Sequence, residues 1–169
     1  MWQDFVSKFT LNFIKEDRWK FILRGLGVTI EITIFALIIG IVIGLLVALV
    51  KTTYENTGKL KIANAITNVY LTIIRGTPVV VQLMILANLI FVGALRETPI
   101  LVIGGIAFGL NSGAYVAEII RAGIEGLDKG QMEAGRALGL SYSQTMRKII
   151  VPQAIKNILP ALVSEFITL

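Results

Sequence analysis

Residues 27–50, GVTIEITIFALIIGIVIGLLVALV, form an apolar run in which Glu31 is the single charged residue. An α-helix needs about 20 apolar residues to span the hydrocarbon core of a bilayer. Inside a bilayer the backbone must satisfy its own hydrogen bonds, which leaves helices and closed barrels as spanning structures. This run therefore predicts a membrane helix, and it limits the chain to folds built around such helices.

Three further segments, 62–95, 99–120 and 149–169, are also rich in apolar residues. The segment 62–95 is too long for one straight span and contains RGTP at 75–78. Thr77 suits the N-cap of a helix and Pro78 its first position, so the membrane helix is expected to restart there. The sequence thus predicts an all-α fold, a polytopic membrane helical bundle.

Residues 1–26 differ from these spans, because basic residues fall between or just after apolar ones at helical spacing. Such a segment favours a position in the plane of the membrane interface, although a plain polar tail is the alternative. The apolar positions are Trp2, Phe5, Val6, Phe9 and Phe13.

The composition excludes several classes of chemistry. Charged residues make up 16% of the chain, against about 25% in soluble domains. The chain has neither Cys nor His, which excludes disulfides, thiolate zinc sites and histidine-based triads. It also lacks a G-x-x-x-x-G-K-[ST] phosphate-binding loop, because Gly58-Lys59 lacks the first glycine and is followed by leucine. No cofactor is expected in this chain, and no ATP hydrolysis by that route.

The basic residues predict an orientation in the membrane. Four of them lie in 51–77 and five in 121–148, but the link at 96–98 has one. The positive-inside rule places the first two stretches in the cytoplasm and the link outside. The N-terminus is then expected outside, although the five basic residues in 1–24 are a discrepancy.

The segment 99–120 carries two different faces. One face holds small residues at every fourth position, a pattern that lets helix backbones approach closely. These residues are Gly105, Gly109, Gly113 and Ala117. Roughly opposite, by the helical period, lie Asn111, Tyr115 and Glu118. The polar face is expected either to turn toward a polar cavity or to hydrogen-bond neighbouring helices, with Glu118 near the cytoplasmic end.

Polar side chains near the middle of the predicted spans are candidates for a substrate path. They are Gln82, Asn88, Asn111, Tyr115 and Glu165. An ionised carboxylate this far into an apolar helix needs a cavity or a charged partner, because an uncompensated charge there is costly. Glu165 is therefore expected either to hold a substrate ammonium group or to pair with a cation from another helix.

The polar stretch EAGRALGLSYSQTMRKIIVPQA at 133–154 interrupts the membrane pattern. Residues 131–138 predict a short helix, and Gly139 suits the left-handed residue that follows it. Ser141 and Gln144 predict a capping box at the start of a second helix. A compact helix–turn–helix on the cytoplasmic side is expected, without groups that bind a phosphate or a metal.

The same stretch resembles the EAA loop of the membrane-spanning permease subunits of bacterial ABC importers. The match consists of Glu133-Ala134-Gly135, then Gly139 six residues after the glutamate, then Ile149-x-Val151-Pro152. Gly135 replaces the usual alanine and Val151 the usual leucine, both small changes. IRGTPVVVQL at 74–83 and NSGAYVAEIIRAGI at 111–124 further resemble the polar amino-acid uptake branch. The resemblance covers most of the chain.

This resemblance implies a type I ABC importer transmembrane domain, in which the helix–turn–helix of the cytoplasmic loop 121–148 is the coupling helix. The implied ATPase-coupling residues are Glu133, Ala134, Gly135, Arg136, Gly139 and Pro152. A cytoplasmic ABC ATPase dimer would drive a polar amino acid into a bacterial cell, and an extracytoplasmic substrate-binding protein would deliver it. A second permease copy, or a similar permease, would complete the pathway through the lipid bilayer. The family continues past Leu169 with another span, so the chain is expected to lack its last helix.

Other interpretations are disfavoured by what the sequence lacks. A channel or secondary transporter fragment is the alternative, but a TVGYG-like filter is missing and intramembrane charges are few. A DNA-reading helix–turn–helix needs more cations than Arg136, Arg147 and Lys148, so no nucleic-acid partner is expected. A membrane hydrolase is disfavoured because GLNSG at 109–113 is not a nucleophile elbow and no histidine can activate Ser112.

Overall fold

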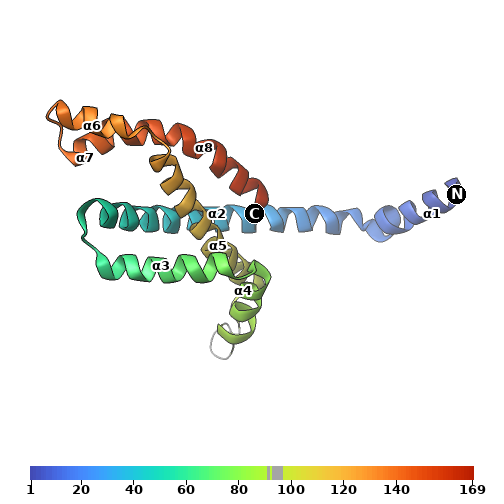
Figure 1. Cartoon of the computed structure of the whole chain (residues 1–169). Coiled ribbons are helices and arrows are strands. Elements are labelled where there is room, and N and C mark those ends of the chain that lie inside the picture. The colour runs from blue at the N-terminus through green and yellow to red at the C-terminus, as the bar shows by residue number, and fades with distance from the viewer. Residues whose placement is uncertain (91, 93–96) are drawn as a thin grey trace.

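A computed structural model describes residues 1–90, 92 and 97–169. All regular structure in these residues is helical, and the N-terminal helix projects from a bundle formed by the rest (Figure 1). The α-helices are α1 (Trp2–Phe9), α2 (Trp19–Thr57), α3 (Lys61–Gly76), α4 (Val79–Ile85), α5 (Ile100–Glu125), α6 (Lys129–Ala137), α7 (Tyr142–Thr145) and α8 (Val151–Thr168). Single π-helical turns cover Thr10–Ile14, Leu86–Ile90 and Met146–Ile150, and a 3-10 turn covers Lys15–Asp17.

Within the described residues, three helical stretches are long and apolar enough to cross a membrane: Trp19–Thr57, Ile100–Glu125 and Tyr142–Thr168. A fourth crossing results if α3 and the helical stretch Val79–Ile90 form one bent span. The helices run past the predicted limits of the spans, since α2 extends on both sides of 27–50 and α5 continues beyond residue 120. The predicted cytoplasmic loop 121–148 therefore begins inside α5.

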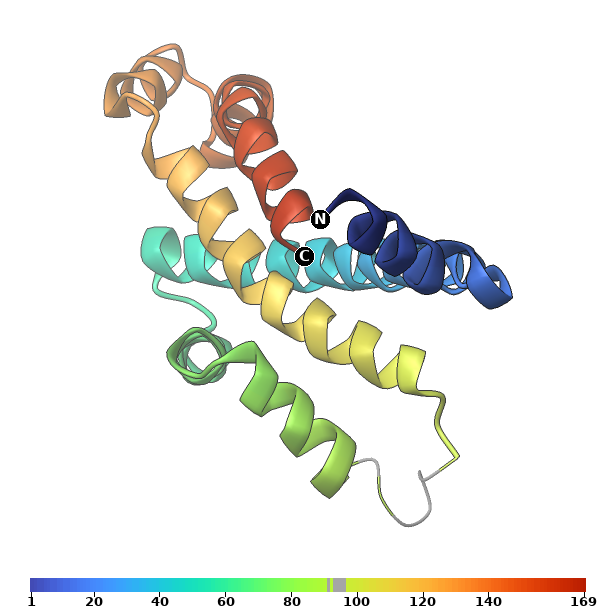
Figure 2. The same ribbon diagram turned by 90° about the vertical axis from the view of Figure 1, so that its right-hand side faces the viewer.

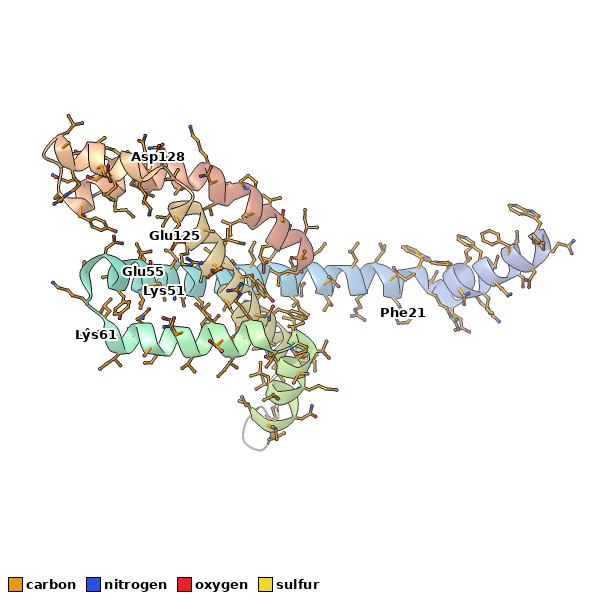
Figure 3. All side chains as sticks on the ribbon, in the orientation of Figure 1. Phe21, Lys51, Glu55, Lys61, Glu125 and Asp128 are labelled. Carbon is orange, nitrogen blue, oxygen red and sulfur yellow. The ribbon has the colours of Figure 1, made fainter. Side chains whose placement is uncertain are left out.

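A kink separates the N-terminal segment from α2. Glu16 and Asp17 have positive φ angles of 59° and 56°, which interrupt the helical path before α2 begins. α2 starts at Trp19, so it begins inside the predicted interfacial segment 1–26. Phe21 marks the stretch of α2 that lies outside the bundle (Figure 3).

Four aromatic side chains form a row along this projecting segment. Trp2, Phe5, Phe9 and Phe13 stack in succession, with ring centroids 5.8, 6.3 and 4.9 Å apart. All four side chains are exposed. The helical spacing predicted for these residues is confirmed, and it gathers their rings on one side of the segment.

The main contact of the bundle is the crossing of α2 and α5, and Figure 2 shows α5 running across α2. Gly40 of α2 lies against Ser112 of α5, and Gly44 lies against Val116. A Cβ atom added to Gly44 would lie 2.5 Å from Val116 Cγ1 and 2.9 Å from the backbone nitrogen of Ala117. The backbones of the two helices are thus close enough that this position of α2 has no room for a side chain.

The glycines of α5 likewise pack closely against side chains of α2. Cβ atoms at Gly105, Gly109 and Gly113 would collide with Phe35, Ile39 and Ile43, in that order. The packing face predicted for these glycines is therefore confirmed. Lipid tails are as apolar as leucine, so membrane helices associate through close packing rather than through the removal of water.

α3 and α4 meet at a bend of 109°. The bend falls at Thr77 and Pro78, where the sequence predicts a restart of the helix. Pro78 itself is the N-cap of α4, and the Thr77 hydroxyl donates to the carbonyl oxygen of Ile73 (2.8 Å). The predicted N-cap role of Thr77 is wrong, because its hydroxyl bonds within the preceding helix. Residues 91 and 93–95 of the predicted span 62–95, and residue 96 of the link, lie outside the described residues.

The C-terminal helix α8 packs against α5. Gly123 of α5 lies against Ile158 of α8, and Ala154 is buried at the same contact. The π-helical turn and α7 precede α8 without a break, so one helical stretch runs from Tyr142 to Thr168. The predicted last span, 149–169, therefore starts inside a longer helix.

The α2–α5 contact predicts a position-dependent effect of a single methyl group. Gly44→Ala is expected to lower the free energy of unfolding by about 1–3 kcal/mol, because Val116 and the α5 backbone leave no room for it. Gly27→Ala is the matched control on the same helix, since nothing lies within 4 Å of a Cβ atom there. Unfolding of the purified protein in mixed micelles measures both; equal stabilities would contradict the packing described here.

Candidate functional site

The turn between α6 and α7 is built by local hydrogen bonds. Asp128 caps the start of α6 by accepting from the backbone nitrogen of Gly130 (2.8 Å). At its end, Gly139 has a φ of 81° and donates to the Arg136 carbonyl (3.0 Å), while Leu140 donates to the Gly135 carbonyl (3.1 Å). This pair of bonds is a Schellman motif, which satisfies the last carbonyls of a helix. The predicted left-handed role of Gly139 is confirmed.

The second helix of the turn begins with the predicted capping box. The Gln144 backbone nitrogen donates to Ser141 Oγ (3.3 Å), and the Ser141 backbone nitrogen donates to Gln144 Oε1 (2.8 Å). The backbone groups on both sides of the turn are thus satisfied by local partners. The helix–turn–helix projects at one end of the molecule (Figure 1).

Gly135 is where the two helices of the turn touch. A Cβ atom on Gly135 would collide with Thr145 Cγ2 and lie 2.9 Å from its Oγ1. Both residues are buried, and Thr145 has no exposed surface. Glycine in place of the usual alanine is therefore more than the small change expected from sequence, because here it makes room for a branched side chain.

The remaining motif residues lie on the surface of this projection. Glu133, Ala134 and Arg136 are exposed on α6, and Pro152 is exposed in the first turn of α8. Leu138, at the tip, is 80% exposed although it is apolar.

A cavity of about 750 Å³ separates the helix–turn–helix from the bundle. Carboxylates from three parts of the chain line it: Glu55 at the end of α2, Glu125 at the end of α5, and Asp128 and Glu133 around α6. Glu55, Glu125 and Asp128 gather at this end of the molecule in Figure 3. Among the described residues, no group of three or more acidic side chains is arranged to hold a metal ion.

The Gln82 side chain forms hydrogen bonds at the bend between α3 and α4. Its buried amide donates to the carbonyl oxygens of Ile74 (2.8 Å) and Thr77 (3.0 Å) and to Thr77 Oγ1 (2.9 Å). Its Oε1 accepts a hydrogen bond from Asn111 Nδ2 (3.3 Å). The amide thus supplies donors to backbone carbonyls that the break leaves without helical partners.

Three of the polar residues proposed for a substrate path meet at one small cavity. Asn111 and Tyr115 of α5 and Glu165 of α8 line a space of about 260 Å³. The other lining residues are Val79, Phe108, Thr168 and Leu169. Asn88 lies apart from this cavity, exposed, and donates to the Met84 carbonyl of its own helix (2.9 Å).

Charged side chains continue along the polar face of α5. Glu118 accepts from Arg121, and Arg121 also donates to Glu125 (2.5 Å). Arg75, at the end of α3, places Nη1 3.6 Å from Glu118 Oε2 and its guanidinium carbon 5.9 Å from the centre of the Tyr115 ring. Glu118 is thus held by two guanidinium groups rather than by solvent alone.

Arg75 is not among the candidate site residues predicted from the sequence, where it is one of the four basic residues in 51–77. Its position immediately before the predicted break, in RGTP, is the one local signal that sets it apart. Its partners lie on α5, far away in the sequence, and only the folded chain brings them together.

Comparison with known proteins gives a consistent result. Residues 40–169 match the family described as "Binding-protein-dependent transport system inner membrane component". A putative glutamine transport system permease protein of Rickettsia felis is 43% identical over 151 residues, covering 88% of this chain and 66% of the relative. An arginine transport system permease protein of Bacillus subtilis is 41% identical over 153 residues, with the same two coverages. An L-cystine transport system permease protein of Bacillus subtilis is 37% identical over 160 residues, covering 94% and 65%.

A solved structure, titled as the crystal structure of an amino acid ABC transporter with histidines, has a similar fold. It matches with a TM-score of 0.74 and 40% identity, covering 87% of this chain and 69% of that one. The predicted all-α membrane fold is confirmed by this match. The chain spans 66% of the length of the first curated relatives. It belongs to the family of inner membrane components of binding-protein-dependent transport systems.

Proposed function

We propose that the chain is a membrane-spanning permease subunit of an ATP-driven importer of a polar amino acid. The observation that carries the proposal is the helix–turn–helix, a projection capped at both sides of its turn by Gly139 and by Ser141 with Gln144. The relatives named for glutamine, arginine and L-cystine transport support an amino-acid substrate. ATP hydrolysis is assigned to a separate subunit, because this chain carries no phosphate-binding loop.

The helix–turn–helix is the proposed contact with a cytoplasmic ABC ATPase dimer. Glu133 and Arg136 supply charges on its surface, and Leu138 supplies an apolar contact between them and the turn. An extracytoplasmic substrate-binding protein and a second permease, identical or similar, are the other proposed partners. Because α7, the π-helical turn and α8 form one helical stretch, movement of the projection would pass along it, through Pro160, toward Glu165.

The small cavity lined by Asn111, Tyr115 and Glu165 is the proposed substrate contact. Glu165 is its acidic group and suits an ammonium or guanidinium group of an amino acid. Gln82 acts as a support, since its amide holds the bend and its oxygen orients Asn111. Asn88 has no part in this site, because the fold does not bring it there.

The coupling role predicts that changes in the projection uncouple the transporter without preventing its assembly. Glu133→Ala removes an exposed charge, and Gly139→Val forces a β-branched residue into a left-handed conformation at a cost of about 1–2 kcal/mol. Both variants are expected to abolish the stimulation of ATPase activity by the loaded binding protein in proteoliposomes. Gly139→Asn is the control, because asparagine tolerates this conformation, and it is expected to retain stimulation. Wild-type stimulation in both Glu133→Ala and Gly139→Val would refute the assignment.

The proposed topology places the N-terminus and the 96–98 link outside and the helix–turn–helix inside. The chain has no cysteine, so single cysteines report position cleanly. Thr98→Cys and Ser7→Cys are expected to react with an impermeant maleimide in intact cells, and Ser143→Cys only after permeabilisation. Reaction of Thr98→Cys and Ser143→Cys from the same side would mean that α5 does not cross the membrane. Reaction of Ser7→Cys only after permeabilisation would reverse the placement of the N-terminal segment 1–26 at the outer interface.

Glu165→Gln separates a substrate contact from a structural pair, because it keeps the shape of the side chain and removes its charge. A substrate contact predicts uptake reduced about tenfold or more with the complex still assembled, since a charge-assisted hydrogen bond contributes about 1.5–3 kcal/mol. Uptake of L-glutamine and L-arginine by reconstituted complexes, at saturating binding protein, measures the effect. Thr168→Ser, a change in the same cavity that leaves its charge unaltered, is the control. Unchanged uptake by Glu165→Gln would remove this residue from the path.

A further inference from the structure

An apolar groove lies between α2, α5 and α8. It has a volume of about 390 Å³, and Thr52 is the one polar side chain among the described residues that line it. Its two long walls run from Ile41 to Thr52 on α2 and from Val151 to Leu162 on α8. Leu49, on the α2 wall, is 58% exposed, so the described part of the chain leaves the groove open.

The length of this groove matches one leaflet of a bilayer. At 1.5 Å per residue, the wall from Ile41 to Thr52 is about 16 Å long. The hydrocarbon core of a bilayer is about 30 Å thick, so one leaflet contributes about 15 Å. A further membrane helix would need a groove along the whole core, whereas an acyl chain of one leaflet needs half of it. The groove therefore fits an acyl chain.

The groove adjoins the larger cavity between the helix–turn–helix and the bundle. Thr52, Ile124 and Met146 line both spaces. One space is lined by apolar side chains, and the other carries charged ones. An amphiphile can therefore occupy both at once, with its acyl chain in the groove and its headgroup in the cavity.

The charges of the cavity select the headgroup. Four carboxylates and two cations line it, so an anionic headgroup is repelled overall. Glu125 is already paired with Arg121 (2.5 Å), and Asp128 accepts from the backbone of Gly130. Among the described residues, Glu55 has no ion-pair partner, and it lies about one helical turn beyond the end of the groove wall on α2 (Figure 3). A carboxylate in this place suits an ammonium group.

We propose that the groove and the cavity together bind one phosphatidylethanolamine molecule from the leaflet on the side of the helix–turn–helix. An acyl chain lies along Leu45 and Leu49, the ammonium group donates to Glu55, and the phosphate binds the exposed Lys129. The lipid thereby fills the space between the helix–turn–helix and the bundle. This site is separate from the proposed substrate contact, because the cavity at Glu165 shares no lining residue with either space.

Three lipids with identical dioleoyl chains test the choice of headgroup. The full complex is delipidated in detergent and titrated with phosphatidylethanolamine, phosphatidylcholine or phosphatidylglycerol, and bound lipid is counted by native mass spectrometry. Phosphatidylethanolamine is expected to fill one saturable site per copy of this chain, about tenfold more tightly than the other two. The reason is that a quaternary choline group has no N–H to donate and a glycerol headgroup has no ammonium.

Two variants with matched controls locate the site. Glu55→Gln is expected to bring the affinity for phosphatidylethanolamine within about twofold of that for phosphatidylcholine, because the charge-assisted hydrogen bond is lost. Glu31→Gln, on the same helix but outside the cavity, is expected to change neither affinity. Leu49→Trp fills the groove and is expected to abolish the saturable site. Leu46→Trp is its control, since Leu46 is 59% exposed on the same helix and does not line the groove.

Several results would overturn this inference. Equal affinities of the wild-type complex for the three lipids would mean that the cavity does not select the headgroup. Absence of any saturable site would mean that another part of the protein covers the groove. Equal loss of the site in Leu49→Trp and Leu46→Trp would place the lipid elsewhere. If one of the two test variants does not assemble, unchanged binding of phosphatidylethanolamine by the other overturns the inference.

Discussion

The close approach of α2 and α5 determines where every other functional element lies. Glycines on both helices meet side chains of the partner, so the two backbones come together without room for a methyl group at Gly44. In a bilayer this closeness is the source of helix association, because apolar burial alone does not distinguish a helix from lipid. With one face of α5 held against α2, its polar residues turn toward α3, α4 and α8. The cavity at Asn111 and Tyr115 is a consequence of that packing.

The bend between α3 and α4 shows how a membrane helix can be interrupted. A break leaves backbone carbonyls without partners, which is costly where water is scarce. Gln82 supplies the missing donors to Ile74 and Thr77, and its remaining oxygen accepts from Asn111. One buried amide therefore stabilises the bend and orients a residue of the cavity. Arg75 lies in the last turn of α3, just before this bend, and beside the ring of Tyr115.

The helix–turn–helix differs from the bundle, because the contacts that set its shape lie within it. Caps satisfy the ends of its helices, and Gly135 against Thr145 fixes their approach. This unit continues without a break into α8, which carries Glu165 and has Pro160 in its interior. This continuous helical stretch connects the projection to the cavity.

The sequence by itself determined the features that depend on neighbours a few residues apart. The apolar run 27–50, the break at Pro78, the left-handed Gly139 and the Ser141 cap were all predictable, because each follows from local backbone chemistry. The tertiary structure decided which polar residues meet. It joined Asn111 to Glu165, left Asn88 outside, and brought Arg75 to Glu118 and Tyr115. It also makes glycine a packing requirement at position 135, because the side chain of Thr145 leaves no room there for a Cβ atom. Local rules cannot supply these results, because contacts between distant segments depend on how helix backbones pack in three dimensions, and single-residue patterns do not encode that distance.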